Sequence, residues 1–170
     1  MSDAKDPVKH MLNLALATAL NDLQYYTDEL EKTKIPEVQA LLLVLQESEE
    51  ELIAKIEDMM VTGVISAIDE AKKISGKWDS PSDEPFDFSS PFGSTLQFQR
   101  VSVCNQVLER GLRSHLFYLS ISARAKSKVV SVVFEYIAYM KAQHLLRLRK
   151  VCEALQAESS DTYVRWSNSD

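Results

Sequence analysis

The longest stretch of helical patterning runs from Val129 to Leu155. Apolar residues recur there at steps of three and four, the spacing that places one face of an α-helix into a core. No Pro or Gly interrupts the stretch. Lys141 and His144 fall on the same face as the apolar residues, so the pattern predicts a lysine and a histidine in the interior.

Three more stretches have the same spacing, and the segments between them are short or rich in turn residues. A bend or break is expected near Gly63. The predicted elements are a flexible tail (1–7), helices at 8–33, 36–74, 95–123 and 128–157, a crossover at 75–94, and a polar tail (158–170) that is mobile or contacts a neighbouring subunit. The crossover contains four aromatic residues that we expect to lie against the helices: Trp78, Phe86, Phe88 and Phe92.

These elements predict an all-α fold in one domain of 170 residues. The sequence has only 4 Gly and 5 Pro, too few for the many turns of an all-β fold. A short turn forces two consecutive helices to run antiparallel. Two such hairpins joined by one long crossover form a four-helix bundle with a single crossover connection.

The two halves of the chain also resemble each other. The sequence ALNDLQYY at 19–26 corresponds to GLRSHLFY at 111–118, with two adjacent aromatic residues six and seven positions after a small one. The second and fourth helices keep the same apolar stripe when shifted by about 92 positions. Internal duplication of a helical hairpin is the simplest explanation.

Charge and composition limit the possible functions. The net charge is -6, with 8 Lys/Arg against 19 Asp/Glu in residues 1–95, and 11 against 6 in residues 96–170. We expect the acidic half to pack on the basic half, within the chain or across a homodimer. The acidic total and the lack of a basic patch with interleaved aromatics argue against nucleic-acid binding. No apolar run reaches membrane-spanning length, and the polar start lacks a signal-peptide pattern, so we predict no membrane partner and a cytoplasmic location.

The two cysteines, Cys104 and Cys152, are isolated in sequence. We interpret them as reduced core thiols, with a disulfide or a ligand pair as the alternatives.

The fourth helix supports a resemblance to a known family. Its sequence FEYIAYMKAQHLLRL resembles a phrase of the rubrerythrin branch of the ferritin-like superfamily, in which a glutamate is followed three residues later by a histidine. The aromatic pairs of the first and third helices fit as well, and the resemblance covers residues 8–157. It implies a ferritin-like four-helix bundle. Most rubrerythrins also carry a four-cysteine iron module, which two isolated cysteines cannot build.

Members of that family bind two iron or manganese ions inside the bundle. Two helices supply one Glu each, and the other two supply an E-x-x-H pair each. Carried onto this chain, the resemblance places the six ligand positions at Ala19, Glu49, Leu52, Gly111, Lys141 and His144. Only Glu49 and His144 keep a ligand. The register of the second helix is open, because a slip by two residues would put Glu47 and Glu50 in place of Glu49 and Leu52.

Lys141 is the most informative departure from the family pattern. An ammonium at a carboxylate position repels a cation and offers no lone pair. Glu49 and Lys141 occupy equivalent positions on facing helices, so we expect them to form an interior ion pair. Our hypothesis is that Glu49, Lys141 and His144 form a polar cluster without a cofactor, in a structural or interaction protein rather than an enzyme.

The alternative is a metal-binding oxidoreductase or iron-handling protein. Glu49 and His144 would then be joined by Asp22 or His115 to hold iron or another divalent metal. Without a metal, we interpret Asp22 as a polar group bonded to a Tyr or to water, and both histidines as core or interface residues. A third possibility is a small-molecule pocket near Ala19 and Gly111.

Overall fold

The computed structural model describes residues 7–86 and 95–168, with side chains described for 7–86 and 100–155. Its elements are α1 (Pro7–Lys32), α2 (Pro36–Thr62), α3 (Ile65–Ile74), α4 (Thr95–Arg124) and α5 (Lys128–Asn168). All regular elements in these ranges are helices, which confirms the all-α prediction. No helix in the part of the chain that the structure describes is long and apolar enough to cross a membrane.

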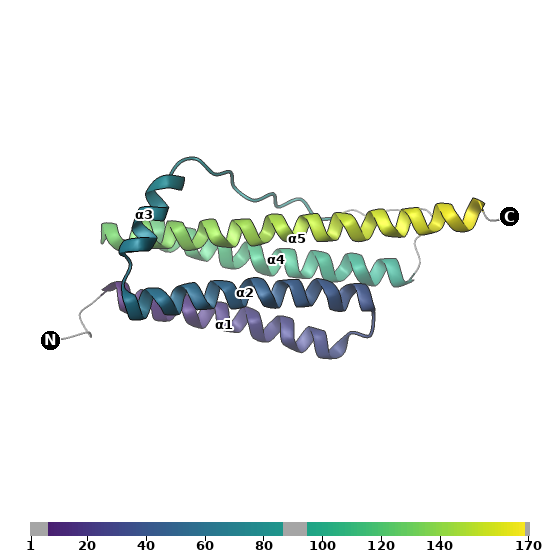
Figure 1. The fold of residues 1–170 in the computed structure, drawn as a ribbon, viewed down its shortest axis with the longest axis horizontal. Coiled ribbons are helices and arrows are strands. Elements are labelled where there is room, and N and C mark those ends of the chain that lie inside the picture. Colours follow the sequence, from purple (N-terminus) through teal and green to yellow (C-terminus); the bar gives the residue numbers. More distant parts are fainter. Residues whose placement is uncertain (1–6, 87–94, 169–170) are drawn as a thin grey trace.

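The four long helices lie side by side as two antiparallel pairs (Figure 1). The helices α1 and α2 form the first hairpin, and α4 and α5 form the second. Pro36 lies in the first turn of α2. Proline is favoured there because an N–H at this position would have no partner within the helix. The described part of the connection from α2 to α4, residues 63–86, lies along α5 and begins with α3, which packs on the start of α5.

The helix predicted at 36–74 is divided in two at Gly63. This glycine has φ of 98°, a left-handed conformation that side-chain-bearing residues rarely adopt. Its N–H donates to the Met59 carbonyl and ends α2 there. The expected break near this position is therefore confirmed.

Several helix boundaries of the first hairpin recur in the second hairpin at a constant distance along the sequence. Lys32 ends α1 and Arg124 ends α4, and these residues are 92 positions apart. Pro36 and Lys128, which begin α2 and α5, are separated by the same number. All five buried residues of α1 have a buried counterpart on α4 at this offset, and so do eight of the ten on α2. The burial pattern thus agrees with an internal duplication.

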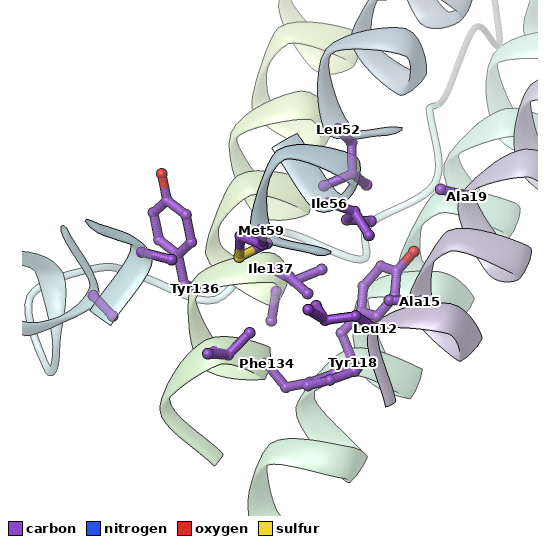
Figure 2. Packing of buried hydrophobic residues seen from close by; sticks show 14 of the residues in the cluster. Leu12, Ala15, Ala19, Leu52, Ile56, Met59, Tyr118, Phe134, Tyr136 and Ile137 are labelled. Atoms are coloured by element: carbon purple, nitrogen blue, oxygen red, sulfur yellow. The ribbon is translucent and has the colours of Figure 1, made fainter. Parts of the chain in front are cut away.

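The apolar interior forms two clusters, one toward each end of the long helices. Figure 2 shows side chains of the first cluster pointing toward one another from α1, α2, α4 and α5. Its labelled members are Leu12, Ala15, Ala19, Leu52, Ile56, Met59, Tyr118, Phe134, Tyr136 and Ile137. The second cluster includes Tyr26, Leu41, Val107 and Leu148.

The crossover packs against the second hairpin, as its aromatic residues suggested. Trp78 makes edge contacts with the rings of His115 and Tyr139, each at a centroid distance of 5.8 Å. The amide of Asn105 joins the crossover through both backbone groups of Phe86, at 2.7 and 3.2 Å. The other two aromatic residues of the prediction, Phe88 and Phe92, lie outside the described residues.

Two sequence predictions are wrong. Cys104 and Cys152 form a disulfide between α4 and α5, with Cα atoms 6.3 Å apart. Their positions meet across the second hairpin, which their separation in sequence did not reveal. A disulfide also weakens the argument for a cytoplasmic location, because such bonds persist mainly in oxidising compartments. In addition, the expected polar tail continues α5 to Asn168, since no Pro or Gly stops the helix.

Candidate functional site

A layer of charged side chains lies between the two apolar clusters. Each long helix has apolar core residues on both sides of a polar position near its middle. The residues of this layer, the charge cluster, are Asp22, Glu49, Arg110, Ser114 and Lys141. All four long helices contribute, so the cluster depends on the assembled fold and not on any single hairpin.

Lys141 is the centre of the charge cluster. Its Nζ donates to Oε1 of Glu49 and lies 3.4 Å from Oδ2 of Asp22. The side chains of Lys141 and Glu49 are each only 2% exposed. The predicted interior ion pair between Glu49 and Lys141 is therefore confirmed, and the lysine does not reach solvent.

Asp22 is bound by three groups. Arg110 Nε donates to Oδ1 at 2.9 Å, Ser114 Oγ donates to Oδ2 at 2.6 Å, and Lys141 contacts the same Oδ2. The interpretation that a Tyr or water satisfies Asp22 is wrong about the partner. Arg110 also stacks on the ring of Tyr25, with its guanidinium carbon 4.3 Å from the centroid. This stacking holds the guanidinium where it can meet the carboxylate.

The charges of the cluster are balanced. Two carboxylates, Asp22 and Glu49, face two cations, Arg110 and Lys141. Burial by itself would lower the pKa of Lys141, but the neighbouring Glu49, Tyr26 and Asp22 raise it overall. Burial raises the pKa of Glu49, with Lys141 opposing that shift. The raised pKa of Lys141 favours its ammonium form, as expected of an amine between two carboxylates.

One side of the charge cluster faces a surface groove between α1 and α4. The groove has a volume of about 360 Å³, and its polar lining includes Thr18, Asn21, Asp22, Arg110 and Ser114. The side chain of Arg110 is 25% exposed there, whereas that of Asp22 is 4% exposed. Arg110 therefore separates the buried carboxylate from solvent.

The two interior histidines stay neutral. His115 Nδ1 lies 2.9 Å from the Ala138 carbonyl, so this nitrogen carries the proton and donates it. Burial lowers the pKa of His115. It also lowers that of His144, to about 3, with the charges of Lys141 and Arg147 adding to the effect. Neither His115 Nε2 nor His144 Nδ1 has a hydrogen-bond partner among the described residues.

The hypothesis of a cluster of Glu49, Lys141 and His144 is thus correct for its first two members. His144 is buried one turn beyond Lys141, whose charge contributes to the lowered pKa of His144, and it does not take part in the Glu49–Lys141 contact. The register left open on α2 is also decided. Glu49 and Leu52 are buried, while Glu47 and Glu50 are exposed, so the slipped register is wrong.

The residues present do not fit a two-metal centre. Four of the six ligand positions, Ala19, Leu52, Gly111 and Lys141, lack a metal-binding group at neutral pH. The two nearby carboxylates, on Asp22 and Glu49, are bound to cations. Within residues 7–86 and 100–155, no three His, Cys, Asp or Glu side chains come close enough to hold a metal ion. Of the alternative set of Glu49, His144, Asp22 and His115, the two carboxylates meet at Lys141, but no three members come together among the described residues.

The space at Gly111 is filled by a neighbouring side chain. A Cβ built at Gly111 would lie 2.5 Å from Leu145 Cδ2 and 4.0 Å from Lys141 Cε. A glutamate at this position would require Leu145 to move. The same packing leaves no interior space for a small molecule directly at Gly111.

Sequence reasoning missed Arg110 and Ser114. A signal for Ser114 was available, because it lies 92 positions after Asp22, which is the offset between the two halves. Polar residues at equivalent buried positions are candidates for mutual contact in a duplicated fold. No such signal marks Arg110. It lies one turn before Ser114 on α4, and its long side chain extends from there to Asp22.

Comparison of the chain with models of protein families, with curated proteins and with solved structures finds no match. The charge cluster and the resemblance in sequence are therefore the observations that bear on function.

Proposed function

We propose that this protein is a rubrerythrin-related, ferritin-like four-helix bundle that has lost its di-iron centre and acts as a structural or interaction protein. The observation that carries the proposal is the position of Lys141. Its ammonium lies between Asp22 and Glu49, at a place where the resemblance implies a metal-binding carboxylate. A cation fixed there neutralises the carboxylates that would otherwise attract metal ions.

In this role the charge cluster contributes to the assembly of the helices. Removing one partner of a buried ion pair strands the other charge in the interior, which typically costs about 3–5 kcal/mol. The cluster therefore holds α1, α2, α4 and α5 together in one arrangement. No chemical step is assigned to it, since Lys141 remains protonated and both interior histidines remain neutral.

Restoring the missing ligands tests the proposal. The variant Ala19→Glu/Leu52→His/Gly111→Glu/Lys141→Glu regains the six-ligand pattern of the family. We expect it to bind about two Fe(II) or Mn(II) ions per chain, measured by elemental analysis after anaerobic loading and desalting. Helical circular dichroism with and without metal reports whether the variant folds.

The matched control retains the lysine. The variant Ala19→Glu/Leu52→His/Gly111→Glu has the same added ligands, but the Lys141 ammonium still stands in the site. We expect this control to bind much less metal than the variant with all six ligands. Tight binding by the unaltered chain, with metal-dependent peroxide consumption, would contradict the proposal and support the oxidoreductase alternative.

We also propose that the protein forms a homodimer. Support comes from the corner between α2 and α3, where Val61 is 84% exposed and Ile65 is 78% exposed. Two large apolar side chains exposed together favour contact with another surface. We expect Val61→Ser/Ile65→Ser to weaken dimerisation in sedimentation equilibrium, while Leu43→Ser, at an exposed apolar position elsewhere on α2, leaves it unchanged. A monomeric parent chain would contradict this part of the proposal.

A further inference from the structure

Two contacts of the charge cluster join equivalent positions of the two hairpins. Asp22 and Ser114 are 92 positions apart, and so are Glu49 and Lys141. The first contact joins α1 to α4, and the second joins α2 to α5. When equivalent residues touch, the two halves are related by an approximate twofold axis that passes between them. The inner face of each hairpin thus packs on the inner face of its own duplicate.

This symmetry determines what each hairpin would meet if it paired with a copy of itself. Two first hairpins would bring Glu49 against Glu49 and Asp22 against Asp22, burying four carboxylates. Two second hairpins would bring Lys141 against Lys141. Buried like charges repel in a medium of low dielectric constant and lack the opposite charge that offsets their desolvation. Only the unlike combination, as in the structure, is balanced.

We infer that the Glu49–Lys141 pair determines which hairpins recognise each other. The inner face of the first hairpin accepts the face of the second hairpin, from the same chain or from a second copy of this chain, and rejects its own kind. Unfavourable like-charge contacts are an established way to obtain such specificity. The partner of each inner face is thus a hairpin with the opposite charge at the equivalent position.

The connectivity of the chain allows this recognition to act between copies. The disulfide joins α4 to α5 and stays within the second hairpin. Among the described residues, no disulfide links the first hairpin to the second. The two hairpins are joined by residues 63–94, so exchange between copies requires only that this connection spans two molecules. The inference does not depend on whether an ancestor bound metal.

The test uses two full-length variants with opposite defects. In Glu49→Lys both hairpins have a lysine at the equivalent position, and in Lys141→Glu both have a glutamate. Each variant alone can form only like-charge pairs at this point. Mixed in equal amounts, unfolded and refolded together, they can exchange hairpins so that a glutamate meets a lysine at both junctions.

We expect the refolded mixture to consist mainly of mixed species that contain both variants, detected by native mass spectrometry with one variant labelled with ¹⁵N. The expected excess over single-variant species is at least about ten-fold, the ratio given by a difference of 1.4 kcal/mol. Mixed species should also melt at higher temperature than either variant alone. If one variant does not fold by itself, rescue by the other is still observable.

The control is the double variant Glu49→Lys/Lys141→Glu, in which each chain carries both charges in exchanged positions. It should refold alone with the size of the unaltered chain. Mixing with that chain should give no more than the statistical proportion of mixed species, because hairpin exchange between these two chains would pair glutamate with glutamate and lysine with lysine. Three outcomes would overturn the inference: no excess of mixed species from the two single variants, an equal excess in the control mixture, or single variants as stable as the parent.

Discussion

The two hairpins share a plan and differ in chemistry. The helices α1 and α4 end at equivalent positions, α2 and α5 begin at equivalent positions, and most buried residues of the first hairpin have a buried counterpart at an offset of 92. The first hairpin supplies the buried carboxylates of Asp22 and Glu49. The second supplies the cations, two neutral interior histidines and a disulfide. The two hairpins share a burial pattern, while the residues that face the shared axis are complementary in charge.

This difference indicates at which positions two hairpins with the same burial pattern can carry different side chains. Apolar positions at the two ends of the helices stay apolar, because any polar group there would need a partner. At the middle layer, polar groups already face one another across the axis. A change on one hairpin can then be balanced by a change on the other.

Removal of Lys141 should have the largest effect. Lys141→Met leaves Asp22 and Glu49 buried without the ammonium, and we expect a loss of about 3–5 kcal/mol in the free energy of unfolding. Urea denaturation followed by circular dichroism measures this loss. Adding Glu49→Met to the same chain should recover a large part of it, because both charges of the pair are then gone. A loss below about 1 kcal/mol, typical of an exposed pair, would contradict the burial of this contact.

Removal of the disulfide should affect the second hairpin selectively. The double variant Cys104→Ala/Cys152→Ala opens a cross-link between residues 48 positions apart, and losses of about 2–4 kcal/mol are typical. Hydrogen exchange should accelerate in α4 and α5 more than in α1 and α2. Two free thiols per chain, found by alkylation of the unreduced, denatured protein, would show that the bond does not form.

The interior histidines should make the protein sensitive to acid. Their pKa values are lower in the folded chain than in the unfolded chain, where histidine titrates near 6.5. Below that pH the unfolded chain binds more protons, so stability decreases as the pH falls toward about 3, the pKa of His144. His144 contributes a slope of up to about 1.4 kcal/mol per pH unit within this range, and His115 contributes in the same direction.

His144→Gln should flatten the acid side of the stability profile between pH 6.5 and 4, because glutamine does not titrate. The matched control is His10→Gln, since His10 is exposed on α1. Stability of the parent chain that stays constant from pH 7 to 4 would be incompatible with neutral buried histidines.

We expect the smallest change in stability from an exposed ion pair between α2 and α5, the helices that the Glu49–Lys141 contact also joins. Glu51 on α2 and Arg147 on α5 are 3.7 Å apart, with side chains 54% and 46% exposed. Solvent screens such pairs, so Glu51→Gln should change the free energy of unfolding by less than about 1 kcal/mol. If Glu51→Gln lowered the free energy of unfolding as much as Lys141→Met, the charge of a pair between α2 and α5 would matter more than its burial.

The sequence predicted the helices well because periodic apolar stripes, short turns and prolines are local signals. Lys141 and Glu49 were also predictable, since both lie on apolar stripes and at equivalent positions of a repeat. The disulfide was not, because pairing of Cys104 with Cys152 depends on the register of α4 against α5. The reach of Arg110 to Asp22 likewise depends on side-chain direction across two helices, which no local pattern encodes.

The iron content of the unaltered chain tests the central claim most directly. The protein is purified from cells grown with added iron, without chelators, and its metal content is determined by elemental analysis. An ammonium held between Asp22 and Glu49 predicts far less than one iron per chain. About two irons per chain, the stoichiometry of a working centre of this family, would contradict the account.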